Sequence, residues 1–136
     1  MEDLFGEYQP MTDGLLCEAI RDALLLEYPT LYVGLPQDNA AIPSPAVLLE
    51  LQSDVVVGSP LQRGTLTVHI CSQADDTTPE AHSAFAAEID ASMRAISWIP
   101  AGVQLYGIVC QSTNLLREER HWRTAINYVL GYGPTH

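Results

Sequence analysis

Apolar residues in the first part of the chain recur at helical spacing. They predict a first helix from Thr12 to about Tyr28, with the oxygen of Thr12 or Asp13 capping its free N–H groups. Pro29 ends this helix, because the residue before a proline avoids the helical region. The predicted apolar stripe consists of Leu16, Ala19, Ile20, Ala23 and Leu24. Residues 1–11 precede it and are predicted to be a flexible arm.

A second helical period follows the run of polar residues at 75–78. Thr78 is suited to the N-cap and Pro79 to the first helical position, and nearby acids match the positive end of the helix dipole. We expect this helix to run to about Trp98. Its predicted buried stripe is Ala81, Ala84, Phe85, Ile89, Ser92, Met93 and Ile96.

Five other segments have the period of two that is typical of strands. They lie at residues 31–33, 46–57, 63–71, 103–110 and 121–130. In the last of them, one face is predicted to hold Trp122, Thr124, Ile126, Tyr128 and Leu130. In the fourth, one face is predicted to hold Val103, Leu105, Gly107 and Val109. Residues 35–45 and 58–60 are predicted to be a loop and a turn, and 111–119 a polar connection.

The resulting order is α-β-β-β-α-β-β, which favours an α+β fold. We expect a mixed or mainly antiparallel sheet of four to five strands, with both helices on one face. A single α+β domain spans 12–132 in this interpretation, and 133–136 form a C-terminal tail. The length of 136 residues fits one domain with its own core.

Charge narrows the range of functions. The formal net charge is −11, with 17 acidic and six basic residues, and every basic residue is an arginine. A nucleic-acid interface needs several cationic contacts with phosphates, and an anionic membrane surface attracts basic segments, so neither kind of partner is expected. The chain shows no signal peptide and no apolar run long enough to span a membrane, which suggests a protein made in the cytosol.

Few residues suggest catalysis or metal binding. His69 and Cys71 lie two apart on one strand face, but two ligands do not make a metal site. Asp75 and Asp76 are explained by their place at a helix start, and His82 is expected to be exposed. His121 heads the last strand, and the cysteines at 17, 71 and 110 fit small apolar side chains in a reducing compartment. The sequence predicts no enzyme, no cofactor and no metal.

Half of the arginines gather in one short segment, residues 117–123. It holds Arg117, Arg120 and Arg123 beside Trp122, and arginine and tryptophan are enriched at protein interfaces. Glu18 and Asp22 of the first helix are candidate partners on another copy of the chain. Two alternatives stay open: the segment is a solvated loop with local ion pairs, and Trp122 is part of the core.

The sequence resembles the tail terminator (tail completion) proteins of tailed phages, including minor tail proteins of Mu-like prophages. The resemblance extends from about Thr12 to Tyr132 and lies in the order of elements and in short motifs without catalytic residues. The motifs are at 31–36, 45–51, 79–82, 120–124 and 128–130.

The resemblance implies a virion structural protein, a subunit of a ring, usually hexameric, that caps the tail tube and ends its polymerisation. Its partners would be other copies of itself, the tail tube protein and the head–tail connector. It would assemble in the host cytoplasm and remain in the virion, at the head-proximal end of the tail. DNA would only pass through the ring, and an acidic lumen would repel its phosphates.

Three alternatives stay open. The first is another neck or head–tail connector protein, and the second is a small cytosolic binding module with a pocket formed by 34–45 and 111–123. The third is an enzyme with an unfamiliar site built on Cys71, His69 and Asp75.

Overall fold

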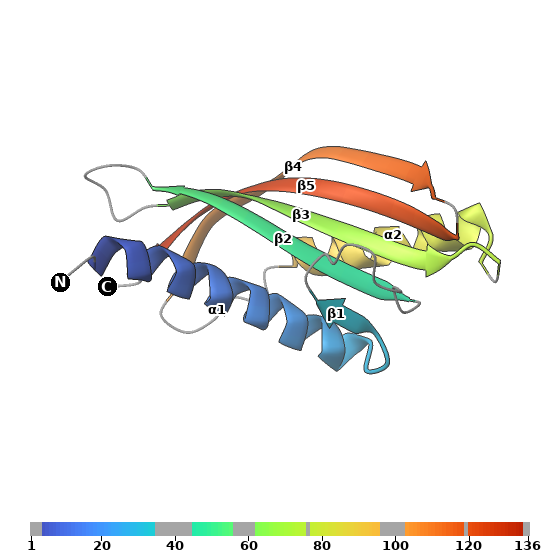
Figure 1. Ribbon diagram of the computed structural model, residues 1–136, viewed down its shortest axis with the longest axis horizontal. Coiled ribbons are helices and arrows are strands. Elements are labelled where there is room, and N and C mark those ends of the chain that lie inside the picture. Colours follow the sequence, from blue (N-terminus) through green and yellow to red (C-terminus); the bar gives the residue numbers. More distant parts are fainter. Residues whose placement is uncertain are drawn as a thin grey trace.

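The computed structural model describes residues 4–34, 45–55, 62–75, 77–95, 103–118 and 120–134. Five strands form one sheet in the order β1-β2-β3-β5-β4, and two helices pack on one of its faces (Figure 1). The predicted α+β class is therefore confirmed. The strands are β1 (Tyr32–Gly34), β2 (Ala46–Val55), β3 (Gln62–Gln73), β4 (Val103–Arg117) and β5 (His121–Pro134), and the helices are α1 (Leu4–Glu27) and α2 (Pro79–Arg94).

The sheet is mixed. β1 pairs with β2 in parallel, whereas the pairs β2–β3, β3–β5 and β4–β5 are antiparallel. The short strand β1 and the long strand β4 therefore form the two edges of the sheet. In Figure 1, α1 runs along the β1–β2 side of the sheet, and β4 forms the opposite margin.

The main core lies between the sheet and the two helices. α1 contributes Leu16, Ile20 and Leu24, all at most 2% exposed. Burial of each such side chain favours folding by about 1.5–3 kcal/mol. Alternate residues of β3 and β5 face these helices, as their period of two predicts: Leu66, Val68, Ile70, Ile126, Tyr128 and Leu130.

The opposite face of the sheet holds a small second cluster. Ala46 and Leu48 of β2 are buried there with Cys71 of β3. Val47 and Leu49 of the same strand are buried on the helix side. The start of β2 is thus apolar on both faces, as its sequence indicates.

The first helix begins earlier than predicted. The backbone is helical from Leu4, so the start at Thr12 is wrong, and most of the predicted 1–11 arm belongs to α1. Leu4, Tyr8, Met11 and Leu15 recur at i, i+4, i+7 and i+11, which gives this segment a helical period of its own. The helical backbone continues through Thr12, even though Pro10 removes one backbone hydrogen bond.

β4 differs most from the sequence prediction. It continues to Arg117, through the segment predicted to be a polar connection. Edge strands tolerate polar residues because one side of their backbone faces solvent. Two register shifts, one between Leu105 and Gly107 and one between Cys110 and Ser112, also interrupt its alternation. Each inserts one residue, so Ile108 and Cys110 pack on the core, and Val109, predicted to share a face with Leu105, is 64% exposed.

The ends of α2 and β5 also shift. α2 ends at Arg94, short of the predicted Trp98, because the N–H of Ala95 bonds to the Ser92 carbonyl in a tighter closing turn. β5 continues to Pro134 and so includes part of the predicted tail, because Tyr132 extends the buried alternation and is 0% exposed. The predicted loop at 35–45 (except Pro45) and the turn at 58–60 lie outside the described residues. No helix among the described residues is long and apolar enough to cross a membrane.

Candidate subunit interface

The arginine-rich segment spans the turn between β4 and β5. The guanidinium of Arg117, the last residue of β4, lies 5.0 Å from the centre of the Trp122 ring, a cation–π contact. The indole N–H of Trp122 donates a 2.9 Å hydrogen bond to the carbonyl of Thr77, just before α2. Trp122 is half-buried, so it anchors the turn and does not belong to the buried core.

Arg120 and Arg123 have different surroundings. Arg120 is exposed, and its carbonyl accepts a bond from the N–H of Ala74, which ties the turn to the end of β3. Arg123 is half-buried, with its Nε 3.1 Å from a Glu118 carboxylate oxygen and a terminal nitrogen 3.4 Å from His69 Nδ1. The predicted cluster is therefore divided. Arg117 and Arg120 are exposed, whereas Arg123 forms an ion pair with Glu118 and contacts His69 within its own chain.

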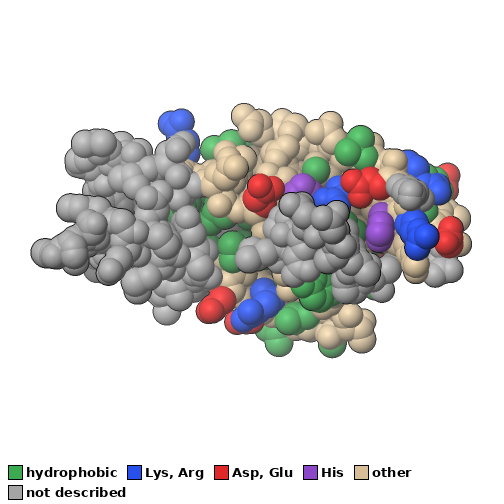
Figure 2. All heavy atoms as spheres, in the orientation of Figure 1, with side chains coloured by type: hydrophobic (Ala, Val, Ile, Leu, Met, Phe, Trp, Pro, Cys, Tyr) green, Lys and Arg blue, Asp and Glu red, His purple; other side chains and the backbone are tan. Residues whose placement is uncertain are grey.

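His69 continues this charged row across the sheet. Its Nε2 lies 3.3 Å from a carboxylate oxygen of Glu50 on β2, so a row of polar contacts crosses β2, β3 and β5 on the face away from the helices. Figure 2 shows acidic, basic and histidine side chains gathered on this side and at the end of the molecule where β4 ends and β5 begins. These pairs are partly exposed, and each contributes little to stability.

The acidic candidates lie on a different element. Glu18 and Asp22 are exposed on α1, and the Asp22 carboxylate is 3.3 Å from Arg21 Nε. One turn further along the same helix face is Leu26, which is 87% exposed. The predicted basic and acidic groups are thus separate within one subunit. β4 and α1 lie at opposite margins of the sheet.

Cys71 is buried beside His69, and the structure uses the two residues differently. Burial raises the pKa of the Cys71 thiol, which keeps it protonated and unreactive. Within the described part of the chain, no three His, Cys, Asp or Glu side chains group as metal ligands would. Asp75 is exposed at the predicted helix approach, and His121 is half-buried at the start of β5. Asp76 and His136 lie outside the described residues.

The prediction that His82 is exposed is wrong. Its ring is 0% exposed, with Nδ1 2.5 Å from the Ser72 hydroxyl of β3 and Nε2 2.8 Å from the Thr124 hydroxyl of β5. Burial lowers the pKa of His82, which favours the neutral ring, with one nitrogen donating and the other accepting. Ser72 and Thr124 are each only 5% exposed, so the trio fastens α2 to the sheet without access for a substrate.

A helical signal for this burial was present in the sequence. His82, Ala86, Ile89 and Met93 recur at i, i+4, i+7 and i+11, and these four are the buried residues of α2. The predicted stripe included Ala81 and Ala84, which are exposed. The buried face is rotated toward His82, because two hydroxyls on the sheet satisfy its polar ring.

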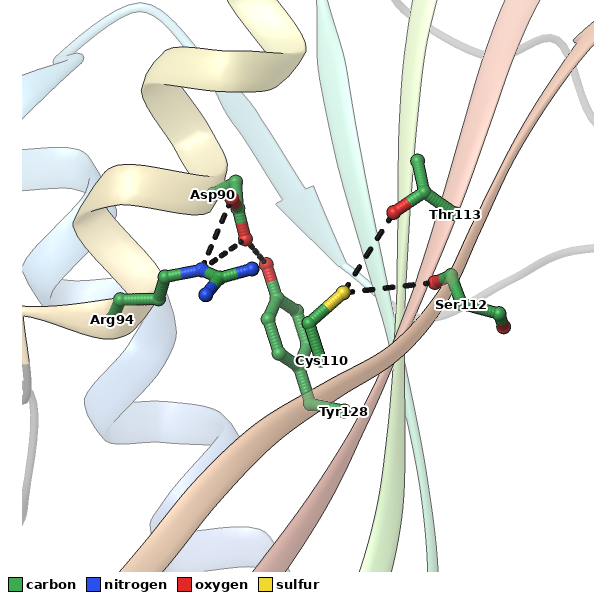
Figure 3. A network of polar contacts seen from close by, with 6 residues as sticks. All are labelled: Asp90, Arg94, Cys110, Ser112, Thr113 and Tyr128. Carbon is green, nitrogen blue, oxygen red and sulfur yellow. Dashed lines mark hydrogen bonds and ion pairs between the residues drawn. The ribbon is translucent and has the colours of Figure 1, made fainter.

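A second polar network joins α2 to β5 (Figure 3). The Tyr128 hydroxyl donates to an oxygen of Asp90, which also accepts from Arg94 Nε at 3.0 Å. Burial, and then the hydrogen bond to Asp90, raise the pKa of Tyr128, so the phenol stays neutral. Figure 3 also shows Cys110 beside Ser112 and Thr113 at the second bulge of β4, where the thiol donates weakly to the Ser112 carbonyl at 3.9 Å.

A shallow hollow of about 310 Å³ lies between the ends of α1 and α2. Its side chains are already hydrogen-bonded to one another: the Tyr28 hydroxyl to Glu88 at 3.1 Å and the Ser92 hydroxyl to Glu27 at 2.7 Å. The hollow does not coincide with the pocket that the binding-module alternative expects, of which 35–44 lie outside the described residues.

Comparison with known proteins identifies a shared fold. No family model and no curated protein matches the sequence. A chain in the virion of a native gene transfer agent particle superposes with a TM-score of 0.68 at 13% identity, covering 90% of this chain and 97% of that chain. A second solved chain, at 18% identity, covers 88% of this chain and 95% of that chain with a TM-score of 0.43. At these identities, the likeness to the virion chain establishes that the two chains share a fold.

Proposed function

We propose that the chain is a virion structural protein, a tail terminator subunit that forms a ring on the end of a phage tail tube. The observation that carries this proposal is the fold shared with a virion chain over 90% of this protein and 97% of the other. Coverage this complete on both sides means that the likeness concerns the whole architecture. The short motifs that resemble tail terminators support the finer assignment.

The distribution of charge supports a ring built from one kind of contact. Arg117 and Arg120 lie at the β4 margin, and Glu18 and Asp22 lie on α1 at the other. A cyclic assembly repeats a contact between two different surfaces of the same subunit, so it needs complementary patches that do not coincide. Two opposite margins of opposite charge meet that requirement. The proposed ring is hexameric, as in the family that the sequence resembles.

The partners in this proposal are the tail tube protein on one side of the ring and the head–tail connector on the other. DNA only passes through, and the net charge of −11 favours a lumen that phosphates do not bind. The protein acts by binding and shape, without catalysis. It assembles in the host cytoplasm and stays at the head-proximal end of the tail.

The test has two parts. Light scattering over a range of concentrations gives the mass of the purified protein, and a species near six subunits supports the ring. The protein is then added to tail tube protein during polymerisation, and tube lengths are measured by electron microscopy. A terminator shortens the tubes and appears as a cap on one end. Tubes of unchanged length with the protein bound to an end indicate another neck protein. A protein that neither oligomerises nor binds tubes contradicts the proposal.

A further inference from the structure

Large apolar side chains reach solvent at only two places in the described part of the chain. Leu26 and Tyr32 lie at the α1–β1 margin, 87% and 37% exposed. The others are on β4: Tyr106, Val109, Leu115 and Leu116, between 47% and 64% exposed. A contiguous exposed apolar patch marks an interaction surface, and a cyclic assembly joins two different surfaces of the same subunit.

The last six residues of β4, Ser112–Arg117, form a regular run beyond the second bulge. All six are exposed, and β4 has only β5 as a neighbour. Proteins commonly protect such an edge with lysine, proline, inward-pointing charges or β-bulges, and both bulges of β4 precede this run. β4 has no acid, lysine or proline, and its one charged residue is Arg117. This run has no acidic residue, and its last three residues are two leucines and an arginine, in a strongly acidic protein.

Register shows which of its side chains face the helix layer. Leu115 is opposite Thr124 and Arg117 is opposite Trp122, and Thr124 contacts His82 of α2. Leu115 and Arg117 therefore project from the helix side of the sheet, and Leu116, opposite Arg123, projects from the other side.

The exposed face of α1 has a matching pattern. Glu18, Asp22 and Leu26 are four residues apart and lie along one face of the helix. Residues four apart on a helix rise by about 6.0 Å, and residues two apart on a strand by about 6.8 Å. Leu115 and Arg117 thus have nearly the same spacing as Leu26 and Asp22. The strand pair consists of an apolar and a basic residue, and the helix pair consists of an apolar and an acidic residue.

We propose that the helix side of the 112–117 run, formed by Leu115 and Arg117, docks on the face of α1 that carries Glu18, Asp22 and Leu26 in a second copy. Leu115 packs on Leu26 and Arg117 pairs with Asp22. The inference rests on the proposed ring and specifies its interface. A second copy is the occupant because the same chain carries the complementary charge and apolar residue at its opposite margin.

The absence of lysine from the sequence allows a direct test. A carbodiimide joins amines to carboxylates, and in an Arg117→Lys variant the introduced side chain is the one lysine of the sequence. The assembled protein, free or on tail tubes, is treated and then denatured, and cross-linked peptides are identified by mass spectrometry. We expect a ladder of multimers absent from wild type, with the introduced lysine joined to Asp22 or Glu18. Arg63→Lys, at an exposed arginine of β3, is the matched control and gives no such ladder.

The second part of the test replaces the apolar residues of the proposed contact with a polar one. Leu26→Gln and Leu115→Gln are each expected to weaken assembly about ten-fold or more per interface, with unfolding by urea unchanged. Leu116→Gln is the control, because Leu116 is as exposed but lies on the other side of the sheet. Rings that form while cross-links map away from α1, or that respond only to Leu116→Gln, overturn this interface and leave the ring intact. A protein that never assembles, alone or on tubes, overturns both proposals.

Discussion

Tyr128 and Asp90 join the central part of the sheet to α2 through one hydrogen bond. The phenol of Tyr128 is buried on β5, and its hydroxyl donates to an Asp90 carboxylate oxygen at 2.5 Å. Asp90 is held in turn by Arg94, one helical turn along α2. The bond therefore fixes how α2 lies on the sheet, which sets the shape of the helix layer.

Removal of this hydroxyl is expected to destabilise the fold. Tyr128→Phe keeps the ring in the core and deletes one hydrogen bond to a charged group, so we expect a loss of about 1–3 kcal/mol in the free energy of unfolding. Equilibrium unfolding in urea measures it. Tyr106→Phe is the matched control, because Tyr106 is 52% exposed on the edge strand, and that change is expected to leave stability unaltered. Equal stability of the Tyr128→Phe variant and wild type would contradict this role.

His82 makes stability depend on pH in a defined direction. Its folded pKa lies below the ordinary value of 6.5, because burial disfavours the charged ring. Below pH 6.5, the unfolded chain binds a proton at His82 that the folded chain does not bind. The stabilising contribution of the neutral His82 ring is therefore complete above pH 6.5 and decreases as the pH falls. Proton linkage limits this group's slope to about 1.4 kcal/mol per pH unit.

The measurement is urea unfolding at several pH values between 7 and the onset of carboxylate titration. His82→Gln is expected to lower stability at neutral pH and to flatten the slope. His121→Gln is the control, since that residue is half-buried at the start of β5. If the pH dependence of the unfolding free energy persisted in His82→Gln and disappeared in His121→Gln, it would come from His121, and the prediction would be wrong.

Thr78 is a cap that the sequence predicted and the structure confirms. Its hydroxyl accepts the N–H of Ala81 at 3.1 Å, and Pro79 follows at the first helical position. Thr78→Ala is expected to lower stability by about 1 kcal/mol, whereas Thr78→Ser keeps the oxygen and most of the stability. Thermal and urea unfolding of the two variants test this prediction. Equal losses of stability in both variants would mean that the Thr78 hydroxyl does not stabilise the helix.

Local signals in the sequence predicted those features whose causes are local. The cap at Thr78 and the alternation of Leu66, Val68 and Ile70 depend on neighbouring residues, and both were predicted. The bulges of β4 depend on its pairing with β5, which the sequence of β4 alone does not encode, so the exposure of Val109 was missed. His82 was misplaced because its partners, Ser72 and Thr124, are 10 and 42 residues away.

In the candidate interface too, the sequence did not predict features that depend on residues distant in the chain. The arginine-rich segment and the α1 acids were found from composition, but their division into exposed and internally paired residues was not. Arg123 is partnered by Glu118, five residues before it in the chain, and by His69 from another strand. The sequence does not indicate that Leu26 and Leu115 are exposed, because their exposure depends on the folded chain.

Charge reversal tests the electrostatic part of the ring. Arg120 and Glu18 are exposed on opposite margins, so Arg120→Glu and Glu18→Arg are each expected to weaken assembly about two- to five-fold per interface while leaving the free energy of unfolding unchanged. The double variant exchanges the two charges and is expected to recover much of the loss. Higher salt should weaken wild-type assembly too, because exposed charges are screened over about 10 Å at 0.1 M.

Light scattering of the four proteins, with Arg63→Glu as a control at an exposed arginine of β3, gives the dissociation constants for a double-mutant cycle. Coupling between the two sites requires that the double variant assemble better than the sum of the single effects predicts. Strictly additive losses would place Arg120 and Glu18 in separate contacts. The pairing of Arg117 with Asp22 would then have to account for the electrostatic part of the interface by itself.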